Sequence, residues 1–189
     1  MNNEKNLLVL SGPSGSGKDT LMRHLVQRCP EIRLSVSATT RERRPAEQEG
    51  IDYYYLSKEE FERRIQQGDL LEYTHYCGNF YGTLKSEVDG RLAKGEPVAL
   101  VIEVEGAANI KRIYPDSTAI FIKPPSMEEL ERRLHYRNTE SEEKIAARLR
   151  RAVEELKYAD KYDYVLVNDD IEACTQAVYE IFAKRRQEG

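Results

Sequence analysis

The feature that most constrains the fold is a glycine-rich stretch near the N-terminus, GPSGSGKDT at residues 12–20. A short apolar run, NLLVLS, precedes it, and a segment with apolar residues on one helical face follows it. The spacing G-x-x-x-x-G-K between a strand and a helix is typical of a phosphate-binding loop, in which backbone N–H groups and the helix N-terminus bind an anion. The stretch therefore predicts an α/β fold with a triphosphate site beside the first strand.

We assign ATP, the phosphoryl donor, to this loop and expect the Lys18 ammonium group to bridge its β- and γ-phosphates. The pattern expects Ser or Thr after the lysine as a ligand of Mg²⁺, but this chain has Asp19 followed by Thr20. Either Asp19 holds the metal, directly or through water, or it points away and leaves Thr20 near the phosphates. The loop residues assigned to ATP are Gly12, Pro13, Ser14, Gly15, Ser16, Gly17, Lys18, Asp19 and Thr20.

Apolar runs of strand length alternate with segments of helical period along the rest of the chain. This alternation predicts a parallel sheet covered by helices on both faces, with ligands bound beyond the carboxyl ends of its strands. The expected strands are residues 6–11, 32–37, 97–103, 118–122 and 164–167. Helix starts are expected at the capping boxes Ser57/Glu60, Ser126/Glu129 and Thr139/Glu142, and helix ends at Gly68 and Gly95.

Two polar stretches fit this layered core poorly. Residues 39–75 are rich in tyrosine and charge, and residues 132–157 form a long, highly charged segment of helical period. We expect both to be excursions from the core that close over a ligand. With 189 residues, 40% of them hydrophobic, the chain is expected to form one compact domain that carries these excursions.

Composition excludes several classes of protein. No apolar run approaches the roughly 20 residues that span a bilayer, and the first apolar stretch leads into glycines rather than a cleavage region, which predicts a cytoplasmic protein without a membrane partner. A net charge of -4 argues against nucleic acid as a partner. The three cysteines have no zinc-binding spacing, and nothing in the sequence specifies an oligomeric state.

A basic turn follows the second expected strand, in SVSATTRERR at residues 35–44. Arginine side chains suit bidentate phosphate binding, and Tyr53 and Tyr81 could add hydroxyl donors. By composition alone, a solvated basic turn is as good an interpretation as a phosphate site.

Six stretches together resemble the guanylate kinase family, in the same order and with similar spacing: GPSGSGKDT, SVSATTRERRPAEQEGIDYYYL, LLEYTHYCGNFYGT, IFIKPPSMEELERRL, RNTESEEKIAARLRRA and VNDD. The resemblance runs from residue 7 to beyond residue 170. It implies a P-loop NTPase-type core at about 1–37, 84–131 and 158–189, a mobile GMP-binding region at about 38–83 and a helical lid at about 132–157. It also implies transfer of the γ-phosphoryl group of ATP to GMP with Mg²⁺, a step of purine nucleotide metabolism.

The resemblance also implies an acceptor site. It places Arg41, Arg44, Tyr53 and Tyr81 on the GMP phosphate, and Ser37, Glu72 and Thr83 beside guanine. A carboxylate at Glu72 can accept from both guanine N1–H and N2–H, whereas adenine offers no such pair of donors, so an unpaired buried carboxylate rejects AMP.

The lid arginines are likewise assigned by resemblance. Arg133, Arg137 and Arg148 match the arginines that the family brings over the phosphates, and Asn168 matches a position beside adenine. Without the resemblance, a charged helix is usually a solvated surface. The residues expected to act in catalysis are Lys18, Arg44, Arg137 and Arg148, and those expected to bind ATP outside the loop are Arg133 and Asn168.

One segment departs from the family pattern Asp-x-Asp-x-Gln-Gly, since residues 101–107 read VIEVEGA. Val101 replaces the first acidic residue, Glu103 occupies the second acidic position, and Glu105 stands where glutamine is common. We assign Glu103 to GMP binding, either near guanine or in the magnesium shell, and leave its role open between the two.

Two other functions compete with the guanylate kinase interpretation. The Lys18–Asp19 pair resembles the loop of kinases that act on a sugar phosphate such as ribose 1,5-bisphosphate, although Ser37, Glu72 and Thr83 argue against that acceptor. A non-catalytic, guanylate-kinase-like interaction module is the third candidate. Such modules typically lack an intact phosphate loop, whereas this chain retains Lys18 and the lid arginines.

Overall fold

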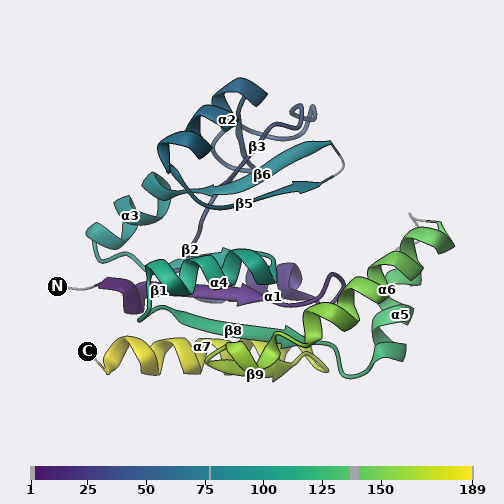
Figure 1. Cartoon of the computed structure of the whole chain (residues 1–189). Coiled ribbons are helices and arrows are strands. Elements are labelled where there is room, and N and C mark those ends of the chain that lie inside the picture. Colours follow the sequence, from purple (N-terminus) through teal and green to yellow (C-terminus); the bar gives the residue numbers. More distant parts are fainter. Residues whose placement is uncertain (1–2, 77, 137–140, 189) are drawn as a thin grey trace.

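The central layer of the molecule is a five-stranded parallel sheet. The computed structural model describes residues 3–76, 78–136 and 141–188. Its strands are β1 (Leu7–Ser11), β2 (Arg33–Leu34), β7 (Val98–Val101), β8 (Thr118–Lys123) and β9 (Tyr164–Val167), in the order β2-β7-β1-β8-β9. All neighbours run parallel, so the carboxyl ends of the strands share one edge, and the phosphate loop leaves that edge from β1 (Figure 1). The expected P-loop NTPase-type sheet is confirmed.

Strand β1 builds two hydrophobic cores because its side chains alternate between the faces of the sheet. Leu7 and Val9 pack with Val88 of α3 (Lys85–Ala93) and Ile110 of α4 (Val104–Ile113). Leu8 and Leu10 pack on the other face with residues of α1 (Lys18–Arg28) and α7 (Ile171–Gln187). Both faces are thus covered, as the near-continuous apolar strands predict.

A second sheet stands above the first (Figure 1) and was not predicted from the sequence. Its strands are β3 (Ser37–Thr39), β4 (Tyr54–Tyr55), β5 (Leu70–Tyr76) and β6 (Asn79–Leu84), in the order β4-β3-β6-β5, and β5–β6 and β3–β6 are antiparallel. Helix α2 (Lys58–Gln67) covers it, with the Phe61 ring stacked on Phe80 at 5.3 Å between centroids. The strand expected at residues 32–37 is therefore split into β2 and β3, because the chain passes there from one sheet to the other.

Helix boundaries agree with most of the capping signals. The Ser57 hydroxyl accepts from the Glu60 N–H at 3.1 Å and the Ser126 hydroxyl from the Glu129 N–H at 3.1 Å. Gly68 ends α2 with a left-handed φ of 71°. The prediction for Thr139/Glu142 was wrong, since the helix begins at Glu142 directly after Ser141, and Thr139 lies outside the described residues.

The arm that corresponds to the expected lid consists of α5 (Met127–Tyr136) and α6 (Glu142–Leu156). The two helices pack through Leu130, Leu134, Ile145 and Ala152 and project beyond the sheet edge on the side of the phosphate loop (Figure 1). The described residues also include two 3₁₀ turns, η1 (Asn3–Asn6) and η2 (Ala159–Lys161). None of the described helices combines the length and apolar composition that a bilayer crossing needs.

Replacing Gly12 by alanine is expected to lower the free energy of unfolding by about 3 kcal/mol. Gly12 has φ 145°, and an added Cβ would lie 2.1 Å from the Ile122 carbonyl oxygen, a backbone atom of the neighbouring strand. Gly90 is the control, because it lies inside α3 with no atom within 4 Å of a built Cβ. Gly90→Ala should stabilise the protein by about 0.5–1 kcal/mol. Urea unfolding checks both, and equal effects of the two changes would contradict the close packing of Gly12.

Candidate functional site

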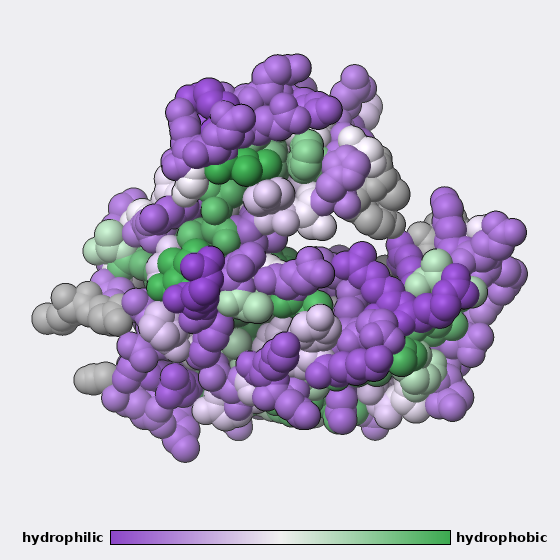
Figure 2. Space-filling view, viewed as in Figure 1, coloured by the Kyte–Doolittle hydropathy of each residue, from purple (hydrophilic) through white to green (hydrophobic). Residues whose placement is uncertain are grey.

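A cleft of about 370 Å³ lies between the two sheets and contains most of the residues assigned to GMP. Figure 2 shows the molecule hollowed between the lobe that carries α2 and the central sheet. The upper wall comes from β3, β5 and β6, and the floor from the segment after β7. The lining residues are Ser37, Tyr53, Glu72, Thr74, Tyr81, Gly82, Val101, Ile102 and Glu103.

The three residues assigned to guanine lie in one row across the second sheet. The strand register pairs Ser37 with Thr83 and Thr83 with Glu72. Cross-strand neighbours have Cβ atoms about 4.5–5.5 Å apart, so these side chains are adjacent although they come from distant parts of the sequence. The second sheet was not predicted from the sequence. It nevertheless brings together the three side chains that the family resemblance assigned to guanine.

Glu72 is a buried carboxylate at the β5 end of this row, next to Thr83. Its side chain accepts a hydrogen bond from the Thr83 hydroxyl at 2.6 Å, and the residue is 8% exposed. Burial raises the pKa of Glu72, and the Thr83 hydrogen bond opposes that shift. Gly106 of α4 lies against it, since a Cβ there would be 2.9 Å from Oε2 of Glu72. The absence of a side chain at Gly106 leaves room for the carboxylate in the pocket.

The basic turn has an organising residue that the sequence analysis missed, Glu47. Its carboxylate accepts from the Arg41 guanidinium at 2.7 Å, from the Arg44 backbone N–H at 2.9 Å and from the Tyr55 hydroxyl at 2.7 Å. These contacts, with the Arg41 bond first, lower the pKa of Glu47 to about 2, and Glu47 in turn raises the pKa of Arg41. An acidic residue three positions after Arg44 was the available signal.

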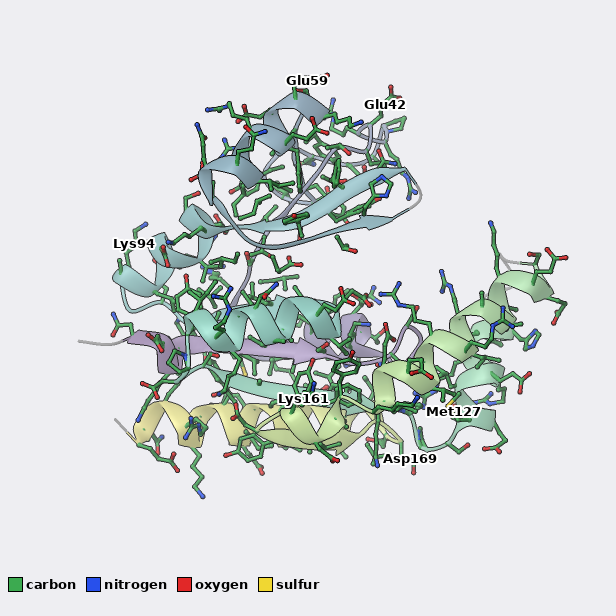
Figure 3. All side chains as sticks on the ribbon, viewed as in Figure 1. Glu42, Glu59, Lys94, Met127, Lys161 and Asp169 are labelled. Carbon is green, nitrogen blue, oxygen red and sulfur yellow. The ribbon has the colours of Figure 1, made fainter. Side chains whose placement is uncertain are left out.

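The expected phosphate ligands divide into two groups. Arg41 lies 5.4 Å from the Tyr53 ring centre, and the Tyr53 and Tyr81 rings are 6.1 Å apart, so these three residues form one cluster beside the cleft. The Arg44 side chain is exposed. Figure 3 marks this turn by Glu42, the residue after Arg41.

Lys18 is held over the phosphate loop. It begins α1 and is 6% exposed, and its ammonium group lies 3.5 Å from the Pro13 carbonyl oxygen. The Ser16 hydroxyl is buried without a hydrogen-bond partner among the described residues. A loop with a buried ammonium and an unsatisfied hydroxyl is suited to a polar anionic ligand.

Two of the lid arginines reach the neighbourhood of this loop. The Arg148 guanidinium lies 3.4 Å from the Ser14 hydroxyl, and Arg133 donates to the Asn168 carbonyl oxygen at 3.0 Å. The Asn168 amide in turn donates to the Ser16 carbonyl oxygen at 2.8 Å. Asn168 therefore connects Arg133 of α5 to the phosphate loop, and its expected contact with adenine stays a prediction. Arg137, the remaining lid arginine, lies outside the described residues.

The chain offers suitable oxygen atoms for Mg²⁺ beside Lys18. Asp19 is exposed in the first turn of α1 and lines a cavity that also borders Tyr53, whereas the Thr20 hydroxyl accepts from Arg23 at 3.3 Å. Among the described residues no three His, Cys, Asp or Glu side chains cluster as a metal cage. Mg²⁺ bound to nucleotide phosphates needs only one or two protein carboxylates, so Asp19 fits the role.

The donor and acceptor halves meet at one edge of the central sheet. Strands β1 and β7 pair in parallel with Leu10 opposite Val101, and the phosphate loop and Glu103 follow directly after these strand ends. The family described as guanylate kinase matches residues 4–185, nearly the whole chain. The chain belongs to the guanylate kinase family.

Individual relatives agree with this assignment. A guanylate kinase of Fusobacterium nucleatum is 51% identical over 173 residues, which cover 91% of this chain and 93% of the relative. One from Desulfitobacterium hafniense is 50% identical over 165 residues, covering 87% and 82%. The crystal structure of guanylate kinase from Anaplasma phagocytophilum superposes with a TM-score of 0.76 at 36% identity, covering 95% of this chain and 85% of that one.

Proposed function

We propose that the chain carries out the reaction of the guanylate kinase family with GMP in the cleft between the two sheets and ATP on the phosphate loop. As a member of this family it is an ATP:GMP phosphotransferase, which converts ATP and GMP to ADP and GDP. The observation that carries the placement is the row Ser37–Thr83–Glu72, whose end members Ser37 and Glu72 line a cleft at the same sheet edge as an intact phosphate loop. A sugar phosphate offers no ring N–H groups to such a carboxylate.

Glu72 is proposed to read the base. Its carboxylate accepts from guanine N1–H and N2–H, while Thr83 and Ser37, which follow it along the row, supply hydroxyls. Because Glu72 is buried, an acceptor base without those two donors would leave its charge desolvated and unpaired, at a cost of about 1–3 kcal/mol or more. Sites of this kind discriminate between ligands by about 10⁴–10⁵.

The GMP phosphate is proposed to lie at the cluster of Arg41, Tyr53 and Tyr81, with the exposed Arg44 side chain turning onto it. Glu47 fixes this turn before the ligand arrives, because it binds the Arg41 guanidinium and the Arg44 backbone together. Arginine forks match phosphate oxygens in a bidentate geometry.

The transfer step needs little covalent help from the protein. A GMP phosphate oxygen attacks the γ-phosphorus of ATP, the bond from that phosphorus to the β-γ bridging oxygen breaks, and ADP leaves with that electron pair. Lys18, Arg148 and Arg137 are proposed to stabilise the charge on the transferred group, with Arg133 and Asn168 holding the ATP side. Mg²⁺ held at Asp19 would neutralise charge on the β- and γ-phosphates.

Phosphorus NMR of ATP, GMP and the protein tests this proposal. We expect the GMP signal and the ATP γ-signal to disappear together while GDP and ADP appear in equal amounts, and a chelator of Mg²⁺ to stop the reaction. Release of inorganic phosphate without GDP would contradict the proposed acceptor. We also propose that the protein acts in the cytoplasm, where ATP and GMP are found.

The pH dependence of GMP use is expected to report the ionisation of Glu72. Burial raises the pKa of Glu72, and guanine requires its charged form, so the KM for GMP should rise as the pH falls from about 8 to about 5. The GMP phosphate itself titrates near pH 6. Glu72→Gln is the control, because it keeps the titration of the substrate and removes that of the carboxyl group. Identical pH slopes for the two proteins would contradict the role of Glu72.

A further inference from the structure

One face of helix α6 contacts both halves of the site. Arg148, Arg151 and Glu155 are spaced by three and four residues and so lie on the same side of the helix. Arg148 reaches Ser14 in the phosphate loop, while Arg151 reaches Glu103, which lines the GMP cleft. The face therefore spans from the donor loop to the acceptor pocket.

The Arg151 guanidinium joins two carboxylates. Its Nη2 donates to Oε2 of Glu103 at 3.0 Å, and its Nε donates to Oε1 of Glu155 at 2.7 Å. The Glu155 side chain is 5% exposed, whereas those of Glu103 and Arg151 are partly open to solvent. One end of the bridge is thus buried beneath α6, and the other end, Glu103, lines the cleft.

An exposed ion pair contributes only about 0–1 kcal/mol, so the Arg151–Glu103 contact by itself would decide little. The buried partner changes this. Burial raises the pKa of Glu155, and its Oε2 has no hydrogen-bond partner among the described residues, so Arg151 is what compensates this carboxyl group. The planar guanidinium is rigid, so fixing its Nε fixes the direction of Nη2 as well.

Local charge also favours an orienting role for Arg151. Glu103, Glu105 and Glu155 all surround this guanidinium. The negative charge of Glu103 raises the pKa of Glu155, and the Arg151 guanidinium between the two carboxyl groups opposes that effect. Arg151 thus holds Glu103 at the floor of the cleft.

We propose that Arg151 is a positioning residue for the acceptor, which holds Glu103 toward bound GMP, and that Glu155 in turn holds Arg151. This inference rests on the proposed function, since it assumes that Glu103 contacts GMP. It gives the lid helix a second task beside that of Arg148, because the helix that covers the donor also sets the geometry of the acceptor pocket.

Arg151→Ala tests this assignment, with Arg150→Ala as the matched control. Arg150 is exposed on the same helix, so its removal changes the charge equally without touching the bridge. We expect Arg151→Ala to raise the KM for GMP about tenfold, with the KM for ATP changed less than about twofold. Arg151→Lys should recover only part of the loss, since an ammonium group cannot make both bonds in the same geometry. An equal loss for both nucleotides, or no loss, would overturn the proposal.

A double-mutant cycle with Glu103→Gln decides whether Arg151 acts through Glu103. The expected result is that Arg151→Ala changes the KM for GMP far less in the Glu103→Gln protein than in the wild type. Equal fold-changes in the two backgrounds would overturn the inference. Failure of the proposed function has a different signature, because the wild-type protein itself would then not phosphorylate GMP.

Discussion

Replacing Lys18 by alanine is expected to lower the turnover number by at least about a thousandfold, roughly 4 kcal/mol of transition-state stabilisation. Lys18 is 6% exposed, and its ammonium group lies 3.5 Å from the Pro13 carbonyl oxygen of the phosphate loop. The ammonium group is already in place when negative charge shifts between the phosphates, so the protein does not have to reorganise around it during the reaction. A water molecule in the Lys18→Ala protein would not supply the same positive charge at that position. Steady-state measurement of ADP release gives the effect directly.

The fold is expected to survive this change. Lys18 serves the ligand, and a buried ammonium group is costly in the empty protein, so the free energy of unfolding of Lys18→Ala should be equal to or slightly above that of the wild type. Lys94→Ala is the control, because Lys94 is exposed at the end of α3, far from the loop (Figure 3). Unchanged turnover in a folded Lys18→Ala protein would contradict the assignment of ATP to this loop.

Glu72→Gln is expected to lower kcat/KM for GMP by about a thousandfold while leaving the KM for ATP within about twofold. The amide can still accept the Thr83 hydrogen bond, so the local structure should persist. The amide has one oxygen that can accept a hydrogen bond from guanine, and its NH₂ group can only donate. It therefore cannot accept from both N1–H and N2–H as the carboxylate can. Steady-state kinetics with each nucleotide varied in turn separates the two effects.

Glu59→Gln is the matched control for Glu72→Gln, because it makes the same chemical change away from the cleft. Glu59 is exposed on the outer face of α2 (Figure 3). This substitution should leave both nucleotides unaffected. Equal losses for GMP and ATP in Glu72→Gln would point to misfolding rather than to recognition of the base.

The central sheet could be predicted from the sequence because its signals are local. An apolar strand, a glycine loop and a helix follow one another within about the first thirty residues, and β9 coincides with the expected residues 164–167. The second sheet could not be predicted in this way. Strands β3 and β4 are three and two residues long, and β5 carries polar residues that face the cleft, so neither length nor apolar alternation marks them.

The site residues likewise differ in whether a local sequence signal predicts them. Residues assigned by a local pattern or by resemblance, such as Lys18 and Glu72, lie at the phosphate loop or in the cleft. Glu47 and Arg151 were missed because their contacts with Arg41 and Glu103 depend on the turn and on the packing of α6, and a charged residue in a charged segment gives no separate signal. The role of Arg151 is tested by the substitutions described above.

The measurement that tests the central claim most directly is ADP release by the wild-type protein with ATP and Mg²⁺, comparing GMP, AMP, UMP and ribose 1,5-bisphosphate as acceptors. The account predicts rapid turnover with GMP and at least about a thousandfold lower kcat/KM with AMP, since only guanine offers two N–H donors to Glu72. Faster turnover with the sugar phosphate, or no turnover with any acceptor, would contradict it.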